Sequence, residues 1–324
     1  MPKKRFNALS LFGGCGGLST GFVKAGFNVV VANENWHEAA VSYRCNHPDT
    51  YVTEGDITSQ KTQDEICERA KGVDLIEGGP PCQAYSLSGF RDPNDPRGHL
   101  FKSYGAIVER IHPKVCVMEN VTGILSMKHE GVLVSELIHA MFDRMGYTVE
   151  HRVLQSEEYG APQLRRRVIF IATLGDKIIW PKKTHGEELL PVMTSREAIE
   201  ELADIEDKLE WWHIRMKHCQ DFIDKIKRTS CGQSVTEFSE AFWRLIPDEP
   251  AKTVKANNGS VFVHYEKDRC ITPRELACLQ GFDWGYAFRG SKGDVLKMIG
   301  NAVPPPMAYA IALAAKKMIQ KSSK

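Results

Sequence analysis

The sequence predicts an α/β fold, a mostly parallel sheet with helices on both faces, accompanied by a smaller second domain. Short apolar runs alternate with helical stretches through the first half of the chain. Several of these runs end directly in turns rich in glycine, proline or acidic residues. The alternation favours parallel strands joined by helical crossovers, as in Rossmann-like sheets, and the turns mark the edge where such sheets bind ligands.

Each expected strand of the first half leads into an expected helix or turn. The first strand covers residues 6–12, and the four glycines within 13–17 form a turn. A helix over 18–26 follows, in which Leu18, Phe22 and Ala25 share one face. Further strands are expected over 27–33, within 49–58 and near 73–77, 114–118 and 167–173, with helices near 36–46, 62–71, 101–111 and 132–145.

The strand–helix rhythm breaks after Trp180 and Pro181. We therefore expect a catalytic domain over residues 1–183, completed by 288–324, and a small domain without recognisable architecture over 184–287. The prolines at 304–306 open an alanine-rich stretch, which predicts a final helix returning to the first domain.

The composition argues against disulfide-rich, zinc-ribbon and membrane-spanning proteins but does not indicate what the protein binds. The chain has 324 residues, a net charge of +1 and nine cysteines without a Cys-x-x-Cys pair. Scattered cysteines favour reduced thiols in a cytosol-like compartment over a disulfide framework or a zinc ribbon. No apolar run approaches the length of a membrane span, and the basic N-terminus lacks a signal-peptide core.

Cys82 is the most informative residue. It follows an apolar run and the sequence Gly78-Gly79-Pro80-Pro81, and proline cannot continue a strand ladder, so the cysteine is delivered at a strand end. Glu119 ends the apolar run 115–118 in the same way. A thiol and a carboxyl at neighbouring strand ends form a nucleophile and an acid. The plain alternative is a cysteine that simply packs.

Three successive strand ends describe an adenosine pocket. The glycine-rich turn allows close approach of a ligand to the backbone, Glu34 can bond both ribose hydroxyls, and Asp56 can accept from an adenine amino group. The dinucleotide fingerprint Gly-x-Gly-x-x-Gly read from Gly14 ends in Ser19, so a pyrophosphate site fits poorly.

Together these segments resemble the DNA (cytosine-5) methyltransferases nearly from end to end. The order Pro-Cys-Gln at 81–83, Glu-Asn-Val at 119–121 and Gln-x-Arg-x-Arg at 163–167 is the most specific part. The resemblance implies a class I methyltransferase fold, S-adenosylmethionine as methyl donor with S-adenosylhomocysteine as product, no metal, and a target-recognition domain beside the catalytic one. It also implies that a cytosine is flipped out of the DNA duplex.

The resemblance assigns the chemistry to four residues. Cys82 would add to ring carbon 6, and Glu119 would donate to ring N3, which requires a raised pKa in a desolvated pocket. Arg165 is our candidate for a fork that braces the base carbonyl and the acid. Arg167 either does the same or supports the site, and a solvated basic run is the alternative for both arginines.

Cofactor and DNA contacts follow from the same resemblance. Asn35 stands where an apolar residue would stack better on adenine and Trp36 comes one step later, so the stacking residue is open. The cofactor set is Phe12, Gly14, Gly16, Gly17, Glu34, Asn35, Trp36, Asp56, Ile57, Pro80, Leu100, Asn301 and Ala302. The DNA-binding set is Gln83, Ser86, Ser88, Arg97 and Gln163.

Two segments have an open role in DNA binding. Residues 83–100 form a long polar stretch beside the nucleophile, expected as a lid over DNA with Ser88 or a neighbour filling the gap left by the base; a plain surface loop is the alternative. The basic stretch 215–228 either tracks phosphates or is the solvated face of a helix.

Competing functions are weaker. A transfer-RNA cytosine-5 methyltransferase is the main alternative, but the Cys-Phe-Thr tripeptide associated with that branch is absent and Ala84-Tyr85-Ser86 follows the nucleophile. A non-catalytic DNA-binding protein or cofactor sensor leaves the catalytic motifs unexplained, as does a nicotinamide-dependent oxidoreductase. The expected partner is double-stranded DNA, a cognate restriction endonuclease is a candidate partner, and we expect a cytoplasmic, nucleoid-associated monomer without membrane contact.

Overall fold

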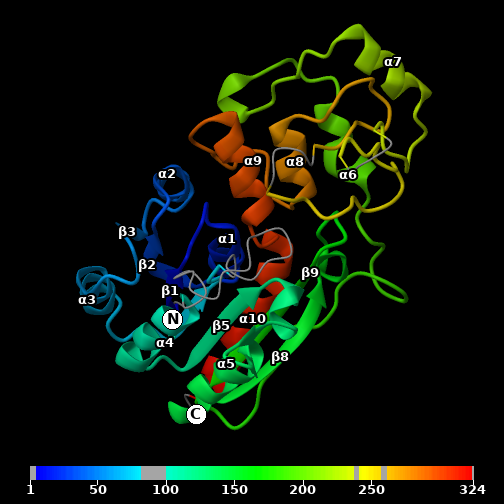
Figure 1. Ribbon diagram of the computed structural model, residues 1–324. Coiled ribbons are helices and arrows are strands. Elements are labelled where there is room, and N and C mark those ends of the chain that lie inside the picture. The colour runs from blue at the N-terminus through cyan, green and yellow to red at the C-terminus, as the bar shows by residue number, and fades with distance from the viewer. Residues whose placement is uncertain (1–4, 82–99, 237–240, 257–260, 323–324) are drawn as a thin grey trace. The chain divides into compact units, whose positions relative to one another are not determined.

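The computed structural model describes residues 5–81, 100–236, 241–256 and 261–322 (Figure 1). Two compact units emerge from the contacts within the chain. The first comprises Met1–Leu154, Arg166–Lys182 and Ala308–Lys324, and the second comprises Gln155–Arg165 and Lys183–Met307. The boundaries of these units differ from the expected domain boundaries mainly at two places. Residues 288–307 and the short segment Gln155–Arg165 belong to the second unit, whereas we expected them in the catalytic domain. The functional boundaries remain a prediction.

The first unit contains a seven-stranded sheet in the order β3-β2-β1-β4-β5-β9-β8. The β1–β2, β1–β4, β2–β3 and β4–β5 pairs are parallel, and β9 runs antiparallel to β5. The predicted fold class is therefore confirmed. The strands are β1 (Asn7–Leu11), β2 (Asn28–Glu34), β3 (Tyr51–Glu54), β4 (Leu75–Gly78), β5 (Val115–Asn120), β8 (Thr148–Gln155) and β9 (Arg166–Thr173).

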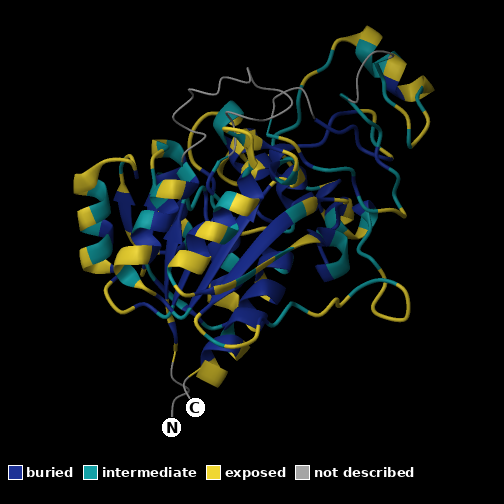
Figure 2. Ribbon diagram, turned by 60° about the horizontal axis from the view of Figure 1, so that its bottom comes forward, coloured by how far each residue is buried: buried dark blue, intermediate teal, exposed yellow. Residues whose placement is uncertain are grey.

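The strands expected from apolar runs lie where the sheet is covered on both faces. Every residue of β4 and β5 is buried, as expected for central parallel strands. Figure 2 shows the sheet in the colour of buried residues, with exposed residues on the outer sides of the helices. Strand β8 was not expected, because its polar and half-exposed residues lack an apolar run. The short hairpin of β6 (Lys128–His129) and β7 (Val132–Leu133) was not expected either.

Helices of the first unit match the expected stretches to within a few residues. Residues of α3, α4 and α5 share one core cluster with the sheet. Helix α1 packs closely on α10, since a Cβ on Gly21 would lie 2.4 Å from the Cβ of Ala308. The helices are α1 (Gly17–Lys24), α2 (His37–Asn46), α3 (Gln60–Arg69), α4 (Leu100–Ile111), α5 (Val134–Arg144) and α10 (Pro305–Ser322).

Strand order reverses between β1 and β4. From β1 the chain builds outward through β2 and β3, and then returns to place β4 and β5 on the other side of β1. In open α/β sheets, ligands bind outside the carboxyl ends of the strands at such a point. The glycine-rich turn and the segment leading to Cys82 follow β1 and β4 respectively.

The second unit is built mainly from short helices and isolated bridges in its described residues. Its helices of five or more residues are α6 (Ser195–Ile199), α7 (Gln220–Arg228), α8 (Pro273–Leu279) and α9 (Lys292–Asn301). Helix α7 buries only Ile226 and carries Lys225, Lys227 and Arg228 in its last turn. In the described part of the chain no single helix is long and apolar enough to cross a membrane, and α9 with α10 passes that test only as a bent pair.

Candidate active site

The ends of β4 and β5 meet in the candidate active site. The side-chain amide of Asn120, the last residue of β5, donates to the carbonyl of Pro80 at 2.8 Å. This bond ties the segment after β4 to the end of β5. Cys82 itself and the expected DNA-binding residues Gln83, Ser86, Ser88 and Arg97 lie outside the described residues.

Glu119 lies against the segment that leads to Cys82. A Cβ added to Gly79 would lie 3.0 Å from Oε2 of Glu119. Glycine at this position therefore leaves the space that one carboxylate oxygen occupies. The expected neighbourhood of Glu119 and the strand end before Cys82 is present in the structure up to residue 81.

Arg167 forms an ion pair with Glu119. Its Nε lies 2.9 Å from Oε1 of Glu119, and the two side chains are only 14% and 11% exposed. Glu119 pairs with Ile169 across the antiparallel β5–β9 ladder. Arg167 lies two residues before Ile169, so its side chain projects from the same face of the sheet as that of Glu119, its diagonal neighbour. Burial lowers the pKa of Arg167 and the carboxylate opposes that shift. Arg167 thus holds one oxygen of the acid.

Arg165 has different partners. It is 1% exposed, and its two terminal nitrogens donate to the carbonyls of Val254 at 2.7 Å and Gly300 at 2.8 Å. The guanidinium therefore joins two distant segments within the second unit. In this structure Arg167 forms the ion pair with Glu119, and the bracing role expected of Arg165 stays a prediction.

Gln163 is also committed to internal bonds. The side chain is fully buried, its amide nitrogen donates to the carbonyl of Leu279 at 3.1 Å, and its oxygen accepts the Val254 amide at 3.1 Å. A second donation from the same nitrogen reaches the side-chain oxygen of Gln280. The amide of Gln163 is thus bonded within the second unit, and the expected DNA contact stays a prediction.

Glu34 organises the glycine-rich turn. Its Oε2 accepts the amide of Gly14 at 2.7 Å and its Oε1 accepts the amide of Trp36 at 2.8 Å. Burial raises the pKa of Glu34, and these amides act in the opposite direction. Gly14 has a φ of 56°, and a Cβ there would meet no atom within 4 Å. The turn therefore presents bare backbone to open space, which fits a ligand held by main-chain groups.

Comparison with known proteins agrees with this geometry. The family model for C-5 cytosine-specific DNA methylases matches residues 6–317. The chain belongs to the C-5 cytosine-specific DNA methylase family. Type II methyltransferase M1.HphI of Haemophilus parahaemolyticus is 35% identical over 96% of this chain and 86% of its own. Type II methyltransferase M.NgoPII of Neisseria gonorrhoeae is 33% identical, over 97% of this chain and 96% of its own.

A solved structure shares the fold of this methylase. An E. coli prophage protein assigned as a DNA modification methyltransferase superposes with a TM-score of 0.81 at 23% identity, covering 97% of this chain and 99% of that one. The predicted family and enzyme class are confirmed, with DNA favoured over transfer RNA. Membership also implies use of S-adenosylmethionine.

The remaining expected cofactor residues of the methylase lie in segments that follow strands or at the ends of helices. Phe12 has a left-handed φ of 56°, which is uncommon for a residue other than glycine. Asn35 is exposed, Trp36 is half-buried at the start of α2, and Pro80 and Ile57 are buried. Gly16 and Gly17 cap and begin α1, and Leu100 begins α4. Asp56 accepts the amide of Thr58 at 2.9 Å. Asn301 and Ala302 end α9 in the second unit.

Asn33 has a structural role at this edge that the sequence did not suggest. Its buried amide donates to the carbonyls of Thr53 at 3.1 Å and Gly55 at 3.0 Å. These bonds hold the carboxyl end of β3 next to that of β2 and fix the turn that carries Asp56. A polar residue inside an apolar strand, beside Glu34, is the signal that could have found it.

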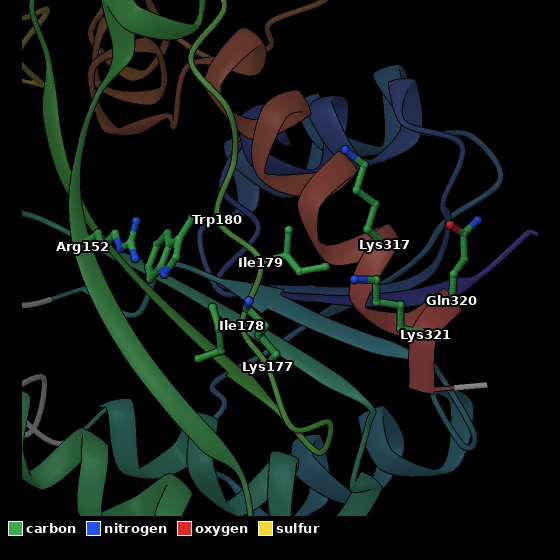
Figure 3. Close-up of a pocket in the computed structure, with 8 residues that line it drawn as sticks. All are labelled: Arg152, Lys177, Ile178, Ile179, Trp180, Lys317, Gln320 and Lys321. Carbon is green, nitrogen blue, oxygen red and sulfur yellow. The ribbon is translucent and has the colours of Figure 1, made fainter. Parts of the chain in front are cut away.

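Two observations concern other parts of the described chain. Among the described residues, no group of three or more His, Cys, Asp or Glu side chains could hold a metal ion. A surface hollow of about 870 Å³ lies between the segment after β9 and helix α10 (Figure 3). Because Thr173 at the end of β9 pairs with Val115 at the start of β5, this hollow is at the opposite edge of the sheet. It is lined by Arg152, Lys177, Ile178, Ile179, Trp180, Lys317, Gln320 and Lys321.

Proposed function

We propose that this DNA methylase methylates carbon 5 of a flipped-out cytosine in a specific short sequence of double-stranded DNA, through a covalent bond between Cys82 and ring carbon 6. The observation that carries the mechanism is the buried Glu119–Arg167 pair, which lies against Gly79, three residues before Cys82. S-adenosylmethionine supplies an electrophilic methyl group when bound.

Cys82 activates the ring. Its thiolate adds to carbon 6, the electron pair of the 5,6 double bond moves to carbon 5, and the ring nitrogen N3 takes a proton. After carbon 5 has accepted the methyl group, a solvent water takes the proton from carbon 5, the freed electron pair re-forms the 5,6 double bond and expels the thiolate, and N3 returns its proton to Glu119. The enzyme is thus restored and the aromatic base recovered.

Glu119 transfers the proton to N3. Arg167 holds Oε1, which directs Oε2 toward Gly79 and the segment that leads to Cys82. We assign the proton transfer to Oε2 and the bracing role to Arg167, because its Nε holds Oε1 and so keeps the carboxyl oriented. Arg165 is a structural residue in this proposal.

The segments after β1 and β4 hold the cofactor. Open space at Gly14, the acceptor Glu34 and the side chains of Trp36, Asp56 and Ile57 suit an adenosine-containing ligand. Asn301 and Ala302 are assigned to the same site by their motif alone. The sequence resemblance assigns DNA contacts to Gln83, Ser86, Ser88 and Arg97, which lie outside the described residues.

Type II relatives suggest the cellular setting. Their names are those of restriction–modification methyltransferases, so we propose a cognate endonuclease that recognises the same site. The monomeric state and the association with the nucleoid belong to the same proposal.

The test uses duplex DNA in which the target cytosine is replaced by 5-fluorocytosine. Fluorine at carbon 5 cannot leave as a cation, so the covalent enzyme–DNA bond persists through denaturing electrophoresis. We expect this adduct with the wild-type enzyme and not with Cys82→Ser. Bisulfite sequencing of genomic DNA and transfer RNA treated with the enzyme locates the target site. Protection of cytosines only in RNA would contradict the proposed substrate.

A further inference from the structure

A buried polar cluster lies directly behind the glycine-rich turn. Glu77 of β4 is 1% exposed and stands opposite Ser10 of β1 in the parallel ladder. The hydroxyl of Ser19 in α1 donates to Oε1 of Glu77 at 2.6 Å, and the hydroxyl of Tyr43 in α2 donates to Ser19 at 2.8 Å. None of these four residues belongs to the catalytic pair or to the expected cofactor set.

The cluster touches both ends of the turn. A Cβ on Gly13 would lie 3.0 Å from the ring of Tyr43 and 3.3 Å from Oγ of Ser10. At the other end, Ser19 is the third residue of α1, which begins at Gly17. Displacement of Ser10, Ser19 or Tyr43 would therefore move the backbone of residues 13–17.

The direction of the hydrogen bonds depends on Glu77. Each hydroxyl has one proton to donate, and only an ionised carboxylate is purely an acceptor. With Glu77 ionised, the order Tyr43 to Ser19 to Glu77 uses every proton in one direction. Ser10, whose Oγ lies 3.1 Å from Oγ of Ser19, also bonds to the carboxylate. When Glu77 is protonated, one of its oxygens becomes a donor, so a hydroxyl that donates to that oxygen has to turn.

The surroundings of Glu77 favour proton uptake near neutral pH. Burial raises its pKa to about 7, while the hydrogen bonds from Ser19 and Ser10 act in the opposite direction. The titratable groups that interact with it are Tyr43 from α2 and Tyr104 from α4. The pKa of both phenols is raised by burial, so both stay neutral while Glu77 titrates.

We propose that Glu77 is a positioning residue for the cofactor, holding the glycine-rich turn in its binding conformation through Ser19, Ser10 and Tyr43. This inference rests on the proposed function, in which that turn binds S-adenosylmethionine. The carboxylate touches no expected ligand; it fixes the hydroxyls on which Gly13 and the start of α1 rest.

The experiment measures the dissociation constant of S-adenosylhomocysteine by calorimetry between pH 6 and pH 9. For the wild type we expect affinity to fall about five- to tenfold as pH drops through about 7, because protonation reverses the hydrogen bonds. Glu77→Gln should bind as weakly at pH 8 as the wild type does at pH 6, with no pH dependence. Ser19→Ala removes one donor to the carboxylate, so the wild-type transition should move to higher pH.

Thermal unfolding separates positioning from simple support of the fold. Replacing a buried charge by a neutral amide should raise the Tm of Glu77→Gln at pH 8 while its affinity falls. Asp74→Asn, a carboxyl near the start of the same strand that pairs with Lys114, is the control and should keep the wild-type pH profile.

Three results would overturn the inference: a wild-type affinity independent of pH, normal binding by Glu77→Gln, or a parallel loss of Tm and affinity in that variant. If Glu77→Gln does not fold, Ser19→Ala provides the test: a transition in affinity at the same pH as in the wild type would overturn the inference. If the wild type binds no S-adenosylhomocysteine at any pH, the proposed cofactor is refuted and this inference with it. Binding with a dissociation constant that does not change with pH is a different result, which refutes this inference alone.

Discussion

At the scale of single residues, the site depends on which group each buried side chain contacts. Arg165 and Arg167 are two positions apart and both largely buried, yet Arg165 donates to the carbonyls of two distant segments whereas Arg167 forms an ion pair with Glu119. Glu119 in turn has its two oxygens in different surroundings, Arg167 on one side and Gly79 on the other. Matched substitutions can therefore separate catalysis from stability.

Exchanging each arginine for lysine tests this division. Arg167→Lys should lower kcat by about 10- to 100-fold with little change in Tm, because an ammonium cannot reproduce the fixed direction in which the guanidinium Nε–H holds Oε1 of Glu119. Arg165→Lys should reduce the free energy of unfolding by about 2–4 kcal/mol through the loss of charged hydrogen bonds to two carbonyls. Single-turnover rates and urea unfolding of both variants check the prediction; the reverse pattern would reassign the brace to Arg165.

Glu119→Gln tests the acid. The amide keeps the shape of the carboxyl but cannot deliver a proton in the same way, so we expect a loss of about 10²- to 10⁴-fold in kcat. Binding of S-adenosylhomocysteine should not change. Retention of wild-type turnover would remove Glu119 from the mechanism.

At the scale of elements, the candidate site lies at the carboxyl ends of the strands, where glycines occupy positions that a side chain would fill or strain. Gly79 makes room for Glu119, and Gly14 adopts a left-handed φ over open space. The strands β1, β2, β4 and β5 could be predicted because buried parallel strands are largely apolar, and antiparallel β9 could be predicted because its buried part is a continuous apolar run. Strand β8 and the short helices of the second unit could not, because their residues are mixed in polarity and owe their conformation to tertiary contacts.

Gly79→Ala tests the packing of the strand end on the acid. The new Cβ would lie 3.0 Å from Oε2 of Glu119, so the carboxyl must shift. We expect about tenfold lower kcat with a small change in Tm. Gly123→Ala is the matched control, because a Cβ there meets no atom within 4 Å. Equal activity of the two variants would show that the placement of Oε2 does not limit turnover.

At the scale of the whole molecule, a buried acid links stability to pH. The pKa of Glu77 is raised from 4.5 to about 7 in the folded protein, so the folded state holds its proton more tightly than the unfolded state. Its contribution to stability is present below pH 4.5 and is lost as pH rises to about 7. The loss is on the order of 3 kcal/mol.

Comparing Glu77→Gln with the wild type isolates this contribution. We expect the variant to gain in relative unfolding free energy between pH 5 and pH 8, since the amide does not titrate. Urea unfolding at both pH values gives the difference. An unchanged difference between the two proteins would mean that Glu77 keeps an ordinary pKa.

The sequence by itself determined the family, the fold class and the edge of the sheet that carries the site. It could do so because apolar strand runs and the turns after Leu11, Gly78 and Asn120 are local features. Only the tertiary structure decided that Arg167 braces Glu119, that Gln163 and Arg165 are internal, and that Glu77 stands behind the glycine-rich turn. Each of these outcomes depends on partners far apart in the chain, and residue spacing fixes the face of a strand but not the atom that a side chain meets there.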